Sequence, residues 1–276
     1  MSKSSRQRSA RERIAEERRK QAVRARQRKL LLGVLGGVTV AAVAVVAVVV
    51  TQSNASRSDQ KGIAYTGPLA PTVRQADGSI LMAKDGVTAP TLEIFEDFQC
   101  PFCKKLEDTA GDAIYKAAAD GRARVVFRPF QLFKAPAHPE PVPSVSRRGA
   151  NAALCTPPGK WASYAKTLFA HQPEEGRNGF ENKDLLNWAR DLGFYSADFD
   201  RCVTGMEKAG DIAKATDYAQ AQRVNSTPTL RLNGKDLTAE QVNQILSAPS
   251  GLEQILTTAA SAPSPSPSPS PTTTDK

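Results

Sequence analysis

A strand–helix–strand pattern built around two cysteines restricts the fold of this chain more than any other feature. Residues 91–98 (TLEIFEDF) are apolar and follow Pro90, so they predict a β-strand. After Cys100, apolar residues recur at helical spacing as far as Gly121. Residues 123–130 (ARVVFRPF) predict a second strand. A connection of this length allows a right-handed crossover between parallel strands, so the pattern predicts an α/β fold.

The remainder of the globular part follows in order along the chain. Residues from about 143 to 223 have helical patterns broken by Pro and Gly, which predicts an inserted helical region. Residues 226–237 (STPTLRLNGKDL) contain a strand and an Asn-Gly hairpin signal. Residues 238–248 begin with a capping-box pattern and predict a helix. We therefore place one domain at residues 63–261, with the helical insertion inside it.

The positive charge of the chain belongs to its first residues. Residues 1–29 hold twelve Lys or Arg and three Asp or Glu, a net charge of +9, and the whole chain also carries +9. Residues 30–276 are therefore neutral overall. A nucleic-acid-binding domain would carry a basic face of its own, so we expect no nucleic-acid partner.

Residues 30–50 (LLLGVLGGVTVAAVAVVAVVV) carry no charged side chain. At about 1.5 Å per residue they just span a hydrocarbon core of about 30 Å, which predicts one transmembrane helix. Basic residues directly before this run place residues 1–29 in the cytoplasm as a tail. The domain would then be extracytoplasmic and anchored to the cell membrane by a single span. The alternative is a cleaved signal peptide, but its apolar region is usually shorter, and no clear cleavage site follows.

Two further segments lack the apolar residues that a core requires. Residues 51–62 (TQSNASRSDQKG) are polar and predict a linker. Residues 262–276 (APSPSPSPSPTTTDK) alternate Pro and Ser for most of their length, which predicts a disordered tail.

The position of Cys100, where a strand gives way to a helix, favours thiol chemistry. Pro101 suits a first helical turn because its missing N–H is not needed there. The free N–H groups and the helix dipole would stabilise a thiolate at Cys100 and lower the pKa of its thiol. Cys103 would lie one turn further on and point inward. One sulfur could therefore attack a disulfide while the other resolves it.

A zinc site is the main alternative for the cysteines. Cys-x-x-Cys is half of such a site, but the other two cysteines, Cys155 and Cys202, are too far apart in the sequence to form a second close pair. His138 and His171 show no ligand spacing. We therefore expect neither a metal nor a cofactor. A papain-type nucleophile is disfavoured because the second cysteine would compete with the substrate.

The sequences FEDFQCPFC, VVFRPF and STPTL, together with the helical insertion, resemble the DsbA-like thiol–disulfide oxidoreductases of the thioredoxin superfamily. The similarity is greatest to membrane-anchored or secreted actinobacterial members and covers about residues 75–250. It implies a thioredoxin-like fold in which Cys100 is the nucleophile and Cys103 the resolving thiol. It also implies that Thr227-Pro228 forms a cis-proline loop at the substrate groove. Pro101 and Phe102 would complete the active-site loop.

The resemblance leaves two matters open. The best-known members carry a histidine where this chain has Phe102, so the oxidising strength of the pair is not determined by the motif. Related folds use a buried carboxylate to move the proton of the resolving cysteine. Glu96 and Asp97 are the candidates for this proton relay, and the alternative is that both are solvated charges at a strand end.

We predict a structural disulfide between Cys155 and Cys202, which fall in two helical stretches of the insertion. An even number of cysteines beyond a membrane span favours disulfides over free thiols. The alternative is that both are buried, unpaired small residues.

These observations predict an extracytoplasmic oxidase that introduces disulfide bonds into reduced exported proteins. The resemblance implies reoxidation by a quinone-linked membrane partner of the DsbB or vitamin K epoxide reductase type. Two alternatives are a disulfide reductase or isomerase that uses the same pair, and a binding module that keeps the fold without turnover.

Overall fold

The computed structural model describes residues 61–87 and 90–261. The predicted basic tail, transmembrane helix and Pro/Ser-rich tail lie outside these residues, as does most of the linker. Among the helices that the structure describes, none has the length and apolar character needed to cross a bilayer.

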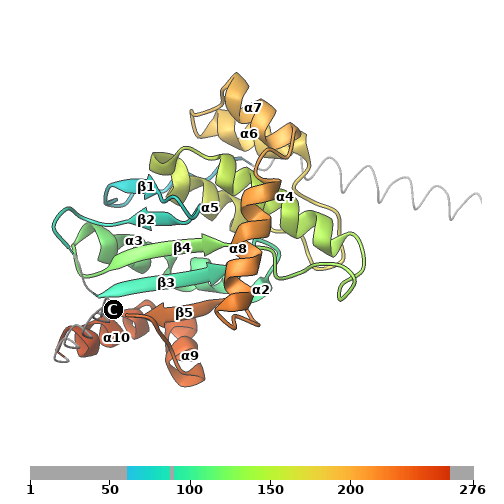
Figure 1. Ribbon diagram of the computed structural model, residues 1–276. Helices are drawn as coiled ribbons and strands as arrows, with labels where there is room; N and C mark the ends of the chain where they lie inside the picture. The colour runs from blue at the N-terminus through green and yellow to red at the C-terminus, as the bar shows by residue number, and fades with distance from the viewer. Residues whose placement is uncertain (1–60, 88–89, 262–276) are drawn as a thin grey trace, which may run out of the picture. The chain divides into compact units, whose positions relative to one another are not determined.

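The described residues form a six-stranded sheet in the order β1-β2-β4-β3-β5-β6 (Figure 1). The central strands β3 and β4 are parallel, and every other neighbouring pair is antiparallel. A mixed sheet with one parallel pair is what a single crossover inserted among hairpins produces. The strands are β1 (Thr72–Arg74), β2 (Ile80–Met82), β3 (Thr91–Glu96), β4 (Arg124–Pro129), β5 (Thr229–Leu232) and β6 (Lys235–Asp236).

The crossover between β3 and β4 confirms the predicted α/β unit, with one difference. Its helix consists of α2 (Pro101–Leu106), a π-helical turn η1 (Glu107–Gly111) and α3 (Asp112–Ala119). The sequence predicted a continuous α-helix here. A π-turn inserts an extra residue into the helix, so the residues before and after it keep an apolar pattern that looks nearly continuous.

The helical insertion lies between β4 and β5, as predicted. It consists of five α-helices and one short 3-10 helix: α4 (Val142–Cys155), η2 (Pro158–Lys160), α5 (Trp161–Ala170), α6 (Asn182–Asp191), α7 (Ala197–Thr204) and α8 (Ala209–Ala221). Cys155 at the end of α4 is bonded to Cys202 in α7, with an S–S distance of 2.01 Å. The two cysteines therefore join the first helix of the insertion to a later one.

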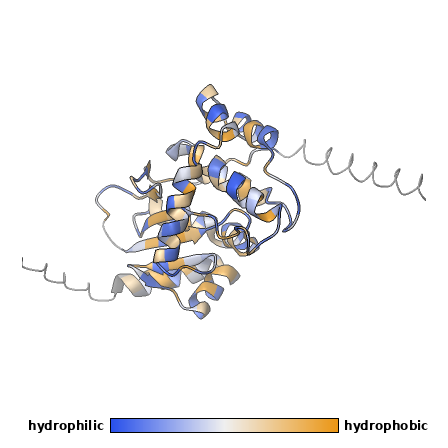
Figure 2. Ribbon diagram, turned by 45° about the vertical axis from the view of Figure 1, so that its right-hand side comes forward, coloured by the Kyte–Doolittle hydropathy of each residue, from blue (hydrophilic) through white to orange (hydrophobic). Residues whose placement is uncertain are grey.

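Helices cover both faces of the sheet. In Figure 1, α8 crosses one face, and α3 lies behind the other. On the α8 side, Phe95 packs with Phe130, Ala219 and Val224. The other face contributes to the main core, in which Trp161 is buried. Figure 2 shows hydrophobic residues along the strands, and both hydrophobic and hydrophilic residues on the helices around them.

The C-terminal part contains both a confirmed prediction and a missed element. Asn233 (φ 52°) and Gly234 (φ 79°) make the predicted turn between β5 and β6, with the positive φ values that an Asn-Gly hairpin requires. The capping box of Thr238 opens α9 (Ala239–Ser247). A further helix, α10 (Pro249–Ser261), was not predicted. The hairpin of β1 and β2 was also missed, because three-residue strands are too short to show a period.

Removing the Cys155–Cys202 disulfide should lower the free energy of unfolding by roughly 4 kcal/mol, because the bond closes a loop across a sequence separation of 47 residues. Urea unfolding of a Cys155→Ala, Cys202→Ala double variant measures this loss. A Cys100→Ser, Cys103→Ser variant is the matched control, since it also loses two cysteines but keeps the Cys155–Cys202 disulfide. Alkylation of Cys155 or Cys202 in the native protein without reductant would contradict the bridge.

Candidate active site

Cys100 lies at the start of α2, where the chain leaves the sheet. β3 ends at Glu96, and the backbone N–H of Cys100 then donates to the carbonyl oxygen of Asp97 at 2.9 Å. Cys100 has extended backbone angles (φ −80°, ψ 121°) and is the N-cap residue, with Pro101 in the first helical turn. Cys103 follows one turn later. Both cysteines are free thiols and both are buried.

The Thr227–Pro228 segment lies directly against Cys100. The peptide bond between these two residues is cis. The Cys100 Sγ donates to the carbonyl oxygen of Thr227 at 3.2 Å, although 127 residues separate the two in the sequence. The fold therefore brings together the two segments that the resemblance assigned to one site.

The pKa of the Cys100 thiol is lowered to about 6. The largest cause is a hydrogen bond from the Cys103 side chain to the Cys100 sulfur; burial acts in the opposite direction. The side chain of Thr227 and the backbone N–H groups of Cys103 and Phe102 also lower the pKa of this thiol. At neutral pH the isolated reduced pair therefore holds Cys100 mainly as a thiolate, the reactive form of cysteine.

The environment of Cys103 shifts the pKa of its thiol in the opposite direction. Burial raises the pKa of its thiol well above the ordinary value, and its hydrogen bond to Cys100 and the charge of Cys100 add to this effect. Only 1% of the residue is exposed. Cys103 therefore keeps its proton at neutral pH, so one cysteine is ready to attack while the other is not.

Phe102 and Lys104 both point away from the buried side of α2. Phe102 is 60% exposed, although it shares the helical spacing of buried Leu106 and Ala110. Lys104 Nζ lies 3.1 Å from a carboxylate oxygen of Asp108, one turn further along. The lysine is therefore engaged in a surface ion pair. Phe102 offers partners an apolar ring beside the nucleophile.

Asp97 serves as a hydrogen-bond acceptor for several segments. Its Oδ1 accepts the backbone N–H of Gln99 at 2.9 Å, and its Oδ2 accepts the N–H groups of Leu132 (2.8 Å) and Phe133 (3.2 Å). The Ser146 hydroxyl donates to the same Oδ2 at 2.7 Å. Burial raises the pKa of Asp97, and these bonds oppose the rise. Both of its oxygens are thus engaged in holding the structure.

Glu96 is buried as well, but one of its oxygens is unused. Its Oε1 is buried and has no hydrogen-bond partner among the residues that the structure describes. Burial raises the pKa of Glu96 well above the ordinary value, and the charges of Glu107 and Asp97 raise it further. The charge of Glu96 in turn raises the pKa of Cys103. Of the two candidates for the proton relay, Glu96 therefore has the free oxygen.

Two residues of this region were not recognised in the sequence. Gln172, just beyond α5, donates through Nε2 to the carbonyl oxygens of Phe98 (2.8 Å) and Cys100 (3.0 Å), and so holds the strand–helix corner. No local pattern marks such a contact. Glu107 is a third buried carboxyl group, one turn after Cys103. The sequence did indicate that Glu107 could be buried, because this residue falls on the apolar face of the predicted helix.

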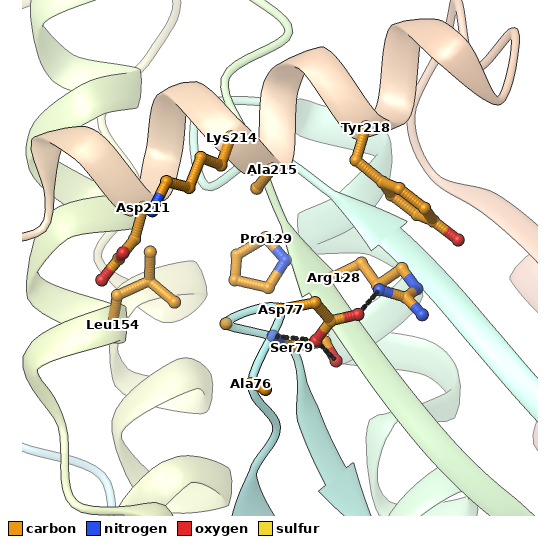
Figure 3. A pocket seen from close by; sticks show the side chains of 11 residues that line it. Ala76, Asp77, Ser79, Arg128, Pro129, Leu154, Asp211, Lys214, Ala215 and Tyr218 are labelled. Atoms are coloured by element: carbon orange, nitrogen blue, oxygen red, sulfur yellow. Dashed lines mark hydrogen bonds and ion pairs between the residues drawn. The ribbon is translucent and has the colours of Figure 1, made fainter.

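Within residues 61–87 and 90–261, no group of three or more His, Cys, Asp or Glu side chains could hold a metal ion. A cavity of about 270 Å³ lies elsewhere, between the β1–β2 turn, β4 and α8 (Figure 3). None of the cysteine-site residues lines it. Because the cysteines do not reach this cavity, we do not assign it to the site. Arg128, which lines the cavity, forms ion pairs with Asp77 at 2.7 Å and Glu93 at 2.8 Å.

Comparison with known proteins identifies the family and the fold of the chain. Residues 87–248 match the family described as thioredoxin. No curated protein matches the chain. The solved structures with similar folds include three of low sequence identity, and the chain covers most of the length of each. MdbA, a thiol–disulfide oxidoreductase from Corynebacterium matruchotii, is 20% identical over 67% of this chain and 93% of its own, with a TM-score of 0.54. MdbA, a thiol–disulfide oxidoreductase from Actinomyces oris, is 18% identical over 73% of this chain and 94% of its own, with a TM-score of 0.55. Oxidised BdbD from Bacillus subtilis is 17% identical over 71% of this chain and 100% of its own, with a TM-score of 0.55.

The reaction of Cys100 with iodoacetamide should reach half its maximal rate near pH 6, because the thiolate is the reacting form and the pKa of this thiol is about 6. The rate should rise as the pH increases through that value, with Cys103 unmodified. Mass spectrometry of the reduced protein across pH 4–9 follows both sites. The same protein in urea is the control, with a midpoint near the ordinary thiol pKa of about 8.5. A native midpoint at that value would contradict the stabilised thiolate.

Replacing Asp97 by Ala should lower the free energy of unfolding by about 3 kcal/mol or more, because the donors that it now satisfies would be left buried and unpaired. Chemical denaturation measures the loss. Asp108→Ala is the matched control, since this carboxylate is exposed and makes only a surface ion pair. Equal stability of the two variants would show that Asp97 does not hold these segments together.

Proposed function

We propose that this chain, which belongs to the thioredoxin family, is a thiol–disulfide oxidoreductase of the DsbA or MdbA type that uses Cys100 and Cys103 as its redox pair. The observation that carries the proposal is the stabilised Cys100 thiolate: the pKa of this thiol is about 6, and its sulfur lies 3.2 Å from the carbonyl oxygen of Thr227. A binding module without turnover would not require a nucleophile of this kind.

The exchange reaction conserves atoms and electrons in two steps. A substrate thiolate attacks Cys100 of the Cys100–Cys103 disulfide, and Cys103 leaves as a thiolate that takes up a proton. A second substrate thiolate then attacks the substrate sulfur of the mixed disulfide, and Cys100 leaves as a thiolate. The substrate gains a disulfide and loses two electrons, which remain on the reduced pair.

The direction that we propose is oxidation of the substrate. A lowered thiol pKa stabilises the reduced form of the pair, and a disulfide whose reduced form is stabilised is a stronger oxidant. Cys100 is also the better leaving group because its thiolate is stable, so release of the oxidised substrate is favoured. The reductase or isomerase reading uses the same residues but requires a more reducing pair.

We also propose a location and partners. The apolar run at residues 30–50, with basic residues before it, supports a single membrane span and an extracytoplasmic domain. Substrates would be reduced exported proteins, for which exposed Phe102 offers an apolar contact beside Cys100. A membrane partner linked to quinones, of the DsbB or vitamin K epoxide reductase type, would reoxidise the pair.

The reduction potential of the pair should lie nearer to the −120 mV of a strong oxidant than to the roughly −270 mV of thioredoxin, because the Cys100 thiolate is stabilised. Equilibration with glutathione measures it, and refolding of a reduced disulfide protein measures turnover. Cys100→Ser should abolish turnover. A Cys155→Ala, Cys202→Ala variant is the control and should keep turnover at a temperature where it is folded. A potential near that of thioredoxin would instead favour the reductase reading.

A further inference from the structure

One side chain bonds the backbone carbonyl groups on both sides of Gln99, and one of these carbonyls belongs to the nucleophile. Gln172 Nε2 lies 2.8 Å from the carbonyl oxygen of Phe98 and 3.0 Å from that of Cys100. An amide nitrogen carries two N–H donors, so both are engaged here. Phe98 and Cys100 are buried, and a buried carbonyl that loses its donor lowers stability.

Gln99 joins the same two segments in the opposite direction. Its Nε2 donates to the carbonyl oxygen of Pro173 at 3.2 Å, and only 1% of the residue is exposed. Gln99 and Gln172 therefore form an amide clasp, in which each side chain bonds the backbone of the other's segment. Bonds in both directions fix the spacing and the orientation of the two segments better than one bond could.

The end of α5 gives Gln172 a firm support. Its backbone N–H donates to the carbonyl oxygen of Phe169 at 3.2 Å. The neighbouring His171 ring stacks on Trp188 of α6, with 4.8 Å between the ring centroids, and its Nε2 lies 2.8 Å from the carbonyl oxygen of Lys61. The amide clasp therefore ties the nucleophile to packed helices of the insertion.

The clasp complements the bonds that Asp97 makes at this corner. The backbone N–H of Gln99 donates to Asp97 Oδ1 at 2.9 Å, and the N–H of Cys100 donates to the Asp97 carbonyl oxygen at 2.9 Å. Asp97 thus holds N–H groups of the corner, whereas Gln172 holds its carbonyl groups. The corner is fixed from the sheet on one side and from α5 on the other.

The carbonyl group of Cys100 is also where α2 begins. Its oxygen accepts the backbone N–H groups of Cys103 at 3.1 Å and Lys104 at 3.2 Å. The N–H groups of Phe102 and Cys103 lower the pKa of the Cys100 thiol. Because these N–H groups belong to the turn that starts at this carbonyl, rotation of the Cys100 peptide would turn them away from the sulfur.

We propose that Gln172 is a positioning residue for the nucleophile: its amide holds the Cys100 carbonyl, so that the N–H groups in the first turn of α2 stay directed at the sulfur. The inference rests on the proposed exchange function, in which Cys100 is the reacting thiol. Gln172 acts through the backbone and not on the sulfur itself. Loss of its amide would leave the Cys100 thiolate less stabilised and the pair less oxidising.

Gln172→Met tests this role, because Met has nearly the same length but no N–H donor. The midpoint of the reaction of Cys100 with iodoacetamide should rise from about 6 by about half a unit to one unit. This rise is about a three- to tenfold loss of thiolate stabilisation. The reduction potential, measured against glutathione, should therefore fall by about 15–30 mV, since a tenfold change corresponds to about 30 mV.

Gln131→Met is the matched control. Gln131 Nε2 also donates to two backbone carbonyl oxygens, those of Phe133 at 3.0 Å and Pro143 at 2.9 Å. These bonds lie in the loop after β4 and at the start of α4, and not at Cys100. Both variants should lose a similar free energy of unfolding in urea, because each takes one amide donor from two carbonyl groups. Only Gln172→Met should move the midpoint and the potential.

A measurement on the unmodified protein covers the case in which Gln172→Met does not fold. In NMR spectra of the reduced protein, the side-chain amide protons of Gln172 should shift with a midpoint near pH 6 as Cys100 ionises. They should also exchange with solvent more slowly than the side-chain amide protons of Gln220, which is exposed on α8.

The outcomes distinguish this inference from the proposed function. If Gln172→Met keeps the unmodified midpoint, or if Gln131→Met moves it equally, Gln172 does not position the nucleophile, although the redox pair stands. The same conclusion follows if the Gln172 amide protons do not respond to the ionisation of Cys100. If the unmodified protein itself has the midpoint of an ordinary thiol, near 8.5, the proposed exchange function fails instead.

Discussion

The hydrogen bonds to the Asp97 carboxylate are the interaction on which the cysteine site depends. This buried group accepts donors from the corner after β3, from the loop after β4 and from Ser146 in α4. It therefore joins the parallel pair at the centre of the sheet to the beginning of the helical insertion. The corner that it fixes is the segment on which Cys100 stands. Cys100 in turn lies 3.2 Å from the carbonyl oxygen of Thr227.

Three buried carboxyl groups near the site show that burial alone does not determine the role of an acid. Asp97 has donors for both oxygens, as a structural group requires. Glu96 and Glu107 each keep an oxygen without a described donor. An unpaired buried oxygen lowers stability, and ionisable groups in such environments are more frequent at functional sites than elsewhere. The fold thus places one satisfied acid and two unsatisfied acids within a short stretch of β3 and the following helix.

The sequence predicted the frame of this structure better than the details of its site. Strong periodicity and the Asn-Gly turn identified the crossover, the insertion and the last hairpin, because these features are local. Local sequence could not show that Asp97 has hydrogen-bond donors for both oxygens and Glu96 does not, since the donors to Asp97 lie at positions 132, 133 and 146. The π-turn was missed because it preserves most of the apolar pattern. Gln172 was missed because its contacts span more than seventy residues.

The insertion between β4 and β5 also determines when the site comes into existence. Cys100 and the Thr227–Pro228 segment are 127 residues apart, and all of α4 to α8 is made between them. A chain that is still emerging from the ribosome can contain both cysteines before the backbone that faces them has been synthesised. Domains fold largely as units, so this site would be assembled only late in that process. The order of the segments therefore postpones the full reactivity of Cys100 until nearly the whole domain is present.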